Sequence, residues 1–169
     1  MTEWSIRRQV SIAAPAEAVW PLVGLPEGLS RWWCPPPTVH LAFDPRPGGR
    51  FEERYDDGSL AYRVEGTIVA YEPPRRLAVR RLTPNSAAPA DVVEITLREE
   101  GSRTRVILRH TFEGPPRERR RDMVDYFARP WSDALRALRR LVTGGTAPRY
   151  PRQPGSAASA ARSGVRPGA

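Results

Sequence analysis

The sequence predicts an α+β fold in which a curved antiparallel β-sheet wraps around one long C-terminal α-helix. The first observation is a wide apolar stripe that recurs at helical spacing along residues 123–142. The second is the alternation of apolar and polar side chains in several segments between residues 39 and 112. The third is that short turns join those segments, which favours antiparallel pairing of consecutive strands.

The predicted C-terminal helix has one face for the sheet and one for water. Its charged residues fall opposite the apolar stripe, as expected for a helix that lies on a sheet. Pro130 has no amide hydrogen, so it either begins a new helix or kinks a longer one. The apolar face comprises Met123, Phe127, Trp131, Leu135, Leu138 and Val142, with Ala134 and Leu141 beside them.

The N-terminal part supplies a strand and then two short helices. Residues 5–12 alternate between apolar and polar side chains and are predicted to form the first strand. Pro15 suits the first position of a short helix, and Pro21 should end or kink that helix. A second short helix is predicted over residues 26–31, before a proline tract at residues 35–37 that forms a stiff connection.

The middle of the chain is predicted to form the rest of the sheet. Glu100, Gly101 and Ser102 mark the clearest hairpin turn, and residues 83–90 form a loop. The expected strands cover residues 39–43, 51–55, 62–72, 77–82, 92–99 and 104–112.

Composition divides the chain into one domain and a tail. Of the 169 residues, 40% are hydrophobic, which is enough for a single core. We assign the domain to residues 1–143. Residues 144–169 are rich in Arg, Pro, Gly and Ala and have almost nothing to bury, so they cannot offset their ordering entropy and are predicted to be disordered.

Several features predict a cytoplasmic protein. No stretch approaches the ~18 apolar residues that a membrane span requires. The N-terminus lacks the apolar core of a signal peptide. Cys34 is the single cysteine, which rules out an internal disulfide and a thiolate metal cluster.

The net charge of +8 resides in the C-terminal third. Residues 1–116 hold 15 arginines and 15 acids, whereas residues 117–169 hold 12 arginines and four acids, and the chain has no lysine. An arginine excess can indicate nucleic-acid binding. A solvated helix face followed by a disordered tail explains the same excess, so nucleic acid is disfavoured as a partner.

The order of elements and several local motifs resemble the START-like (SRPBCC) helix-grip superfamily. Within it, the chain is most similar to the branch homologous to the activator of heat-shock protein 90 ATPase, which includes polyketide-cyclase-like bacterial proteins. The resemblance covers roughly residues 4–142. It is carried by residues 12–20, Trp32-Trp33, residues 44–51, Gly66, residues 73–77, Gly101, residues 104–110, and Trp131 with Leu135 and Leu138.

The resemblance implies a hydrophobic cavity between the sheet and the long helix. Such a cavity takes a lipid, a polyketide or another apolar small molecule in relatives, some of which are enzymes and one branch of which assists a chaperone. The fold alone does not choose among these functions. Our first interpretation is therefore a protein that binds a small hydrophobic molecule.

Three ionisable side chains share a strand face with apolar residues: Glu53, Arg81 and His110. Burial shifts the pKa of a carboxylate or imidazole, so such groups can act as general acids or bases. Structural roles compete with this interpretation, namely hydrogen bonding for His110 and an ordinary ion pair for Glu53 and Arg81.

Aromatic rings on an open cavity would hold a flat apolar ligand, although they can also be plain core. Together with the polar groups they give the candidate ligand-binding set. It comprises Trp32, Trp33, Phe51, Glu53, Tyr55, Tyr62, Val79, Arg81, Leu108, His110, Phe127 and Trp131.

Two alternatives stay open beside ligand binding. One is a cyclase- or dehydratase-type enzyme that uses Glu53, Arg81 and His110. The other is a protein-interaction module of the chaperone-cofactor kind. We predict neither a cofactor nor a metal, because His40, His110 and Cys34 do not form a metal-binding motif. The protein is expected to be a monomer or a homodimer.

Overall fold

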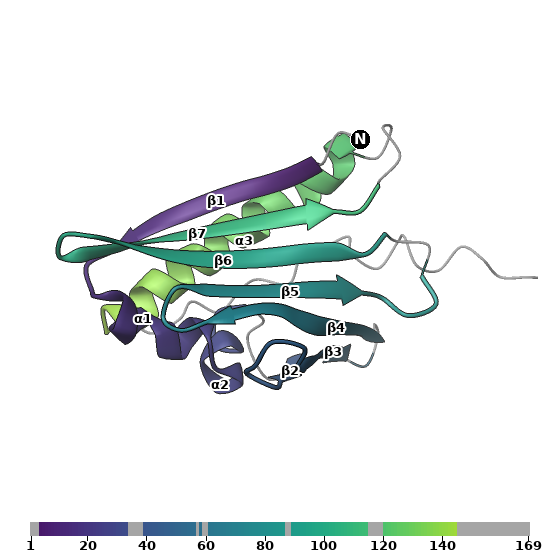
Figure 1. Ribbon diagram of the computed structural model, residues 1–169. Coiled ribbons are helices and arrows are strands. Elements are labelled where there is room, and N and C mark those ends of the chain that lie inside the picture. The colour runs from purple at the N-terminus through teal and green to yellow at the C-terminus, as the bar shows by residue number, and fades with distance from the viewer. Residues whose placement is uncertain are drawn as a thin grey trace, which may run out of the picture.

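In the part of the chain that the structure describes, one antiparallel sheet of seven strands curves around the C-terminal helix, as predicted (Figure 1). This computed structural model describes residues 4–33, 39–56, 58, 61–86, 89–114 and 120–144. The strands lie in the order β1-β7-β6-β5-β4-β3-β2. They are β1 (Trp4–Ile12), β2 (Val39–Phe43), β3 (Arg50–Asp56), β4 (Ala61–Glu72), β5 (Arg76–Leu82), β6 (Asp91–Glu100) and β7 (Arg103–Phe112). The helices are α1 (Ala16–Val23), α2 (Pro26–Leu29) and α3 (Arg120–Val142).

The strand segments follow the predicted alternation, with small differences at their ends. Strands β6 and β7 are joined at Gly101, whose φ of +61° suits glycine in a tight hairpin. Strand β4 carries a bulge between Ile68 and Ala70, and the residue between them, Val69, is exposed. The bulge lets Ile68 and Tyr71 both face the concave side of the sheet, opposite Val79 and Leu77.

Helix α1 differs from the prediction in its use of proline. Pro15 is the N-cap and not the first helical residue, and the helix continues two residues past Pro21. Packing explains this tolerance, because Val19, Trp20 and Val23 are buried and hold the helix against the core. Helix α2 ends at Leu29, before the predicted residue 31.

Helix α1 lies at the end of the sheet where β6 turns into β7, and α2 lies beside α1 and β2 (Figure 1). The backbone amide of Ala16 donates to Oε1 of Glu99 (3.1 Å), and the hydroxyl of Thr104 donates to the carbonyl of Ala14 (2.7 Å). These bonds tie the start of α1 to the hairpin. The opposite end of the sheet is left for the polar residues described below.

Helix α3 is one helix with Pro130 inside it, so Pro130 does not begin a new helix. Proline removes one amide from the helical hydrogen-bond ladder. Within a turn of it, Arg8 of β1 donates from Nε to the carbonyl of Ala128 (3.3 Å) and to Oγ of Ser132 (3.1 Å). These bonds join β1 to α3 at the point where Pro130 leaves the helix without one backbone hydrogen bond.

The core lies between the concave sheet face and α3. Among the side chains of α3 that the structure describes, which do not include Met123, five are buried there: Trp131, Ala134, Leu135, Ala137 and Leu138. Ala137 was not part of the predicted stripe. No helix in the described ranges is long and apolar enough to cross a membrane.

Candidate functional site

A chain of polar side chains crosses the concave face between strands β3 and β7. Nη1 of Arg81 lies 3.4 Å from Oε2 of Glu53, and Nε and Nη2 of Arg81 donate to the two carboxylate oxygens of Asp91 (2.8 and 3.2 Å). Nε2 of His110 lies 3.1 Å from Oδ2 of Asp91. Glu53, Arg81 and His110 are 4%, 7% and 0% exposed, so this row of polar side chains is largely removed from water.

Strand register places these groups together. Arg81 is directly opposite Asp91 on β6 and directly opposite Gly66 on β4. A side chain at Gly66 would bring its Cβ to 2.4 Å from the carbonyl oxygen of Arg80, so the close approach of the two strands requires glycine.

Arg81 holds the buried carboxylate of Glu53 and the partly buried carboxylate of Asp91 in place. Burial alone would raise the pKa of Asp91, but the Arg81 guanidinium and His110 outweigh burial and lower it. The bidentate pair with Asp91 fixes the planar guanidinium, and the ring of Trp33 lies 5.4 Å from its central carbon. The cluster is therefore a rigid ionic unit.

His110 is held as the neutral imidazole. The indole Nε1 of Trp131 donates to Nδ1 of His110 (3.0 Å), and an indole nitrogen can only donate. The ring proton of His110 therefore resides on Nε2, facing Asp91. Burial lowers the pKa of His110 and the charge of Arg81 lowers it further, although Asp91 opposes both.

Aromatic rings surround this polar chain. Trp33 packs edge-on against Trp131 at a centroid distance of 4.9 Å and donates from Nε1 to Oε2 of Glu53 (3.4 Å). Phe51 packs beside Trp33, and Phe127 packs edge-on against His110 at 4.8 Å. The interior at this end is thus mostly aromatic with a few fixed polar groups.

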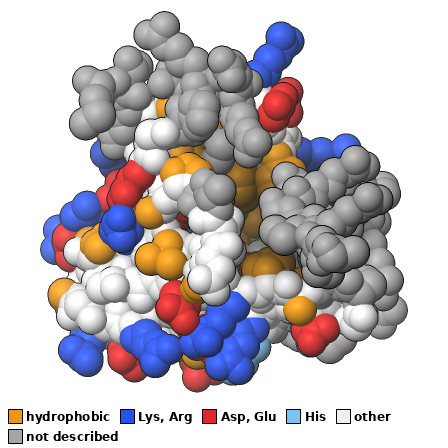
Figure 2. Space-filling view, turned by 90° about the vertical axis from the view of Figure 1, so that its right-hand side faces the viewer, with side chains coloured by type: hydrophobic (Ala, Val, Ile, Leu, Met, Phe, Trp, Pro, Cys, Tyr) orange, Lys and Arg blue, Asp and Glu red, His pale blue; other side chains and the backbone are white. Residues whose placement is uncertain are grey.

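The cluster comes nearest to the surface at Tyr62. This residue is 38% exposed, and its hydroxyl donates to Oε1 of Glu53 (3.1 Å). Its ring stacks on Tyr55 of β3 at 5.2 Å. Figure 2 looks onto the end of the molecule at which β4 begins and β5 ends, and it shows hydrophobic side chains at the bottom of a hollow.

The other candidate residues occupy different depths. Val79 and Leu108 are fully buried on the concave face, and Phe127 is partly buried on α3. Trp32 is fully buried and donates from Nε1 to the carbonyl of Leu22 (2.6 Å), which joins the segment after α2 to α1. The structure thus brings Trp33, rather than Trp32, to the polar cluster. Cys34 lies outside the described residues.

Sequence reasoning missed Asp91, which pairs with Arg81 and lies 3.1 Å from Nε2 of His110. The prediction began the strand at Val92, one residue too late. Continuing the inward alternation of Val93 and Ile95 back by two positions would have placed Asp91 on the same face as Arg81 and His110.

Two further hollows lie outside this interior. One, of about 290 Å³, is formed between β1 and α3 by Arg8, Gln9, Val10, Ser132, Leu135, Arg136 and Arg139. The other, of about 340 Å³, lies on the outer face of the sheet and is formed by Ser5, Arg7, Glu94, Thr96, Arg98, Ile107 and Arg109.

Comparison with known proteins identifies a protein family whose model matches most of the chain. Residues 13–143 match the family model described as activator of Hsp90 ATPase homolog 1-like protein. No curated protein matches the chain.

Solved structures share the architecture at low sequence identity. CalU16 from Micromonospora echinospora is 28% identical, with a TM-score of 0.63 over 85% of this chain and 77% of that one. Protein NE0264 from Nitrosomonas europaea is 23% identical, with a TM-score of 0.68 over 83% of this chain and 95% of that one. Ms6760 from Mycobacterium smegmatis is 22% identical, with a TM-score of 0.66 over 81% and 89%.

Proposed function

The chain belongs to the family of activator of Hsp90 ATPase homolog 1-like proteins, and on that premise we propose that it binds a small hydrophobic molecule, lipid- or polyketide-like, between the sheet and α3. The observation that carries the proposal is the largely buried polar cluster of Glu53, Arg81, Asp91 and His110, which is surrounded by aromatic rings. Taking charged groups out of water costs several kcal/mol each, and apolar side chains of similar volume would fill the same space. An ionic unit kept inside an aromatic interior is therefore a candidate recognition element.

The side chains around the polar cluster suit an apolar ligand with one polar group. Small-molecule sites are mostly apolar and aromatic, with a few placed polar groups that fix orientation. Trp33, Phe127 and Trp131 would contact the apolar body of the ligand. Tyr62 lies between the surface and Glu53, and the Glu53 carboxylate and the Tyr62 hydroxyl oxygen would accept a hydrogen bond from a hydroxyl group of the ligand.

Binding is favoured over catalysis by the state of His110. Nδ1 accepts a hydrogen bond from Trp131, and Nε2 faces Asp91. A general base needs a lone pair within reach of the proton that it removes. Because the Nδ1 lone pair is engaged and Nε2 carries the proton, His110 has no free lone pair with which to act as a general base. Glu53→Gln should then alter binding of an apolar probe little, whereas an enzyme that relies on Glu53 would lose turnover.

The interaction-module alternative would need a contiguous apolar patch of several hundred Å². Among the described residues, the large hydrophobic side chains with high exposure come from different parts of the fold. They are Leu25, Tyr62, Val69, Leu82 and Tyr126. This scatter supports a small ligand over a broad protein surface.

A naphthalene sulfonate dye tests the proposal. The folded protein should bind about one dye molecule, and binding should quench tryptophan emission because Trp33 and Trp131 lie at the site. Val79→Trp adds bulk on the concave face and should block the dye. Val92→Trp makes the same change on the outer face of the sheet, at a position paired with Arg80, and should leave dye binding unchanged.

Circular dichroism and thermal melting establish that each variant is folded. Should Val79→Trp not fold, Phe127→Ala offers a milder change at a partly buried position and should weaken the dye. A folded wild type that takes up no dye would refute the proposal, and so would a folded Val79→Trp variant with undiminished affinity.

A further inference from the structure

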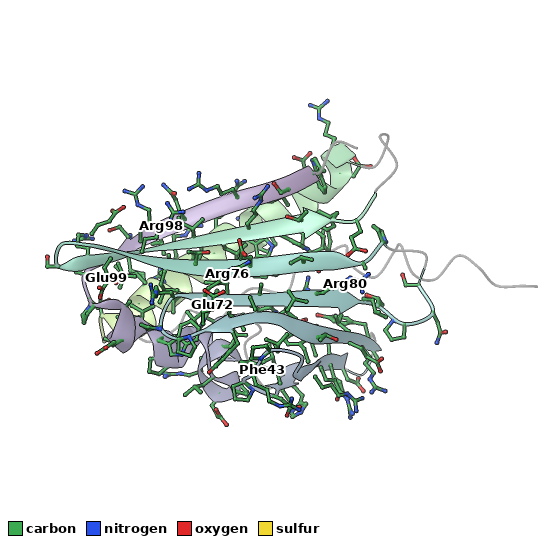
Figure 3. All side chains as sticks on the ribbon, in the orientation of Figure 1. Phe43, Glu72, Arg76, Arg80, Arg98 and Glu99 are labelled. Carbon is green, nitrogen blue, oxygen red and sulfur yellow. The ribbon has the colours of Figure 1, made fainter. Side chains whose placement is uncertain are left out.

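The outer face of the sheet carries a second recessed surface, on the side opposite α3. Figure 3 shows Arg76 and Arg98 on this face, with the helix behind the sheet. The hollow of about 340 Å³ described above lies here, across strands β1, β7 and β6. We call it the outer hollow. It is separated from the aromatic interior by the full thickness of the sheet.

The outer hollow has a low floor and an arginine rim. Ile107 and Thr96 are directly opposite each other on β7 and β6 and form the floor; Ile107 is only 8% exposed although it lies on the outer face. Arg7, Arg98 and Arg109 stand around them with exposed side chains. Long arginine stems cover apolar surface while their charged heads reach water, which produces a rim above a floor.

The lining of the outer hollow carries more positive than negative charge. Glu94 is the one acid in the lining, and Arg76 already binds it, with Nε and Nη2 each 2.7 Å from Oε2. Arg7 and Arg98 make no ion pair with any residue in the described part of the chain. The positive charge of these two guanidinium groups is therefore available to a ligand.

Cross-strand register brings like charges together at this place. Arg7 is directly opposite Arg109 across β1 and β7. Like charges directly opposite each other destabilise a sheet. An anion bound between the arginines would remove this repulsion, so the protein alone carries a cost that a ligand relieves.

We propose that the outer hollow binds a small molecule through a phosphate or diphosphate group. Arginine presents a planar fork that matches phosphate oxygens with two parallel hydrogen bonds. The volume falls at the lower end of the range of small-molecule sites, roughly 300–1,000 Å³. The hydroxyls of Ser5 and Thr96 in the lining provide further donors.

Two macromolecular partners fit the same charge less well. Sheet surfaces that bind single-stranded nucleic acid stack bases on exposed aromatic rings, and no aromatic residue lines the outer hollow. Membrane surfaces are bound by basic residues together with large apolar side chains, and the sole apolar residue of the lining, Ile107, is buried.

Isothermal titration with sodium diphosphate, at low ionic strength and again at about 0.15 M salt, tests the proposal. Wild-type protein should bind one diphosphate and gain thermal stability from it. Arg98→Gln should weaken binding about tenfold, the loss expected for one charge-assisted hydrogen bond. Arg7→Gln should lose the thermal stabilisation by diphosphate while melting at or above the wild-type temperature without it, because the repulsion from Arg109 is gone.

Arg103→Gln is the matched control. Arg103 is exposed on β7, the strand beside that of Arg98, and lies outside the outer hollow; it donates to Oγ of Ser11 (2.9 Å), so the variant removes an equal charge. It should retain wild-type affinity for diphosphate. Equal weakening by Arg98→Gln and Arg103→Gln would reduce the effect to net charge and overturn the proposal. The absence of diphosphate binding to wild type would also overturn it, as would tighter, Arg98-dependent binding of duplex DNA or phosphatidylglycerol vesicles.

Discussion

At the scale of single residues, His110 and Trp131 illustrate how a buried hydrogen bond selects a protonation state. The indole N–H of Trp131 occupies Nδ1, the nitrogen that would take up a second proton. Protonation would place two N–H groups against each other inside the core. Burial and the nearby Arg81 act in the same direction and lower the pKa of His110, whereas Asp91 acts in the opposite direction.

This geometry predicts a pH dependence of stability. The unfolded chain takes up a proton at histidine below about pH 6.5, whereas folded His110 does not until a lower pH. Stability should therefore be fully present above about pH 6.5 and fall as pH drops toward the folded-state pKa, by at most ~1.4 kcal/mol per pH unit from this group. Urea titrations at pH 7.5, 6.5 and 5.5 measure the slope.

His110→Gln should be less stable than wild type at pH 7.5 but should lose less further stability between pH 7.5 and 5.5. His40→Gln is the control, because His40 is the other histidine and is exposed on β2. That variant should keep the wild-type slope. An unchanged slope in His110→Gln would show that His110 is not the group responsible.

At the scale of elements, the hydrophobic periodicity predicted α3 correctly, and Pro130 does not interrupt the helix. The stripe containing Trp131, Leu135 and Leu138 is buried as predicted, and the charged face is exposed. Pro130 is nevertheless accommodated inside a continuous helix, because packing on the sheet and the bonds from Arg8 hold the helix on both sides of it.

Two neighbouring substitutions on α3 test its rotational phase. Leu135 is 2% exposed, so Leu135→Ala should cost about 2–5 kcal/mol through lost burial and an internal cavity. Arg136 is exposed and pairs with Asp133 on the same helix, so Arg136→Ala should cost about 0.5 kcal/mol or less. Urea titration of both variants gives the comparison. The reverse ranking would mean that the helix presents a different face to the sheet.

At the scale of the whole molecule, the domain boundary is a proposal that rests on composition. The last buried helix residues are Ala137 and Leu138, and residues 145–169 lie outside the described part. Deleting residues 146–169 should shift the melting temperature by no more than about 2 °C, because the tail has almost nothing to bury.

Deleting residues 137–169 is the informative contrast. It removes Ala137 and Leu138, both 0% exposed, and should prevent cooperative folding. Differential scanning calorimetry distinguishes the two truncations. A fall of more than a few degrees with the shorter deletion would show that the tail packs on the domain.

The residues of the polar cluster could be predicted in part from the sequence, but the contacts between them could not. Alternation placed Glu53, Arg81 and His110 on inward faces, and the structure buries all three. Which of them touch was beyond the sequence, because three separate strands supply them and only the register of the sheet sets their distances. Asp91 was missed for a related reason, since the end of a strand is fixed by its partners more than by its own residues.

The sequence by itself determined the fold class, the order of elements and most of the inward-facing residues, because side chains recur on one face with a period of two in strands and 3.6 in helices. Tertiary structure alone decided that Pro21 and Pro130 stay inside helices, that Trp33 and not Trp32 meets Glu53, and that arginines face one another on the outer sheet. Those outcomes depend on packing and register between segments far apart in the chain. Such long-range contacts override local preferences whenever the buried surface outweighs them.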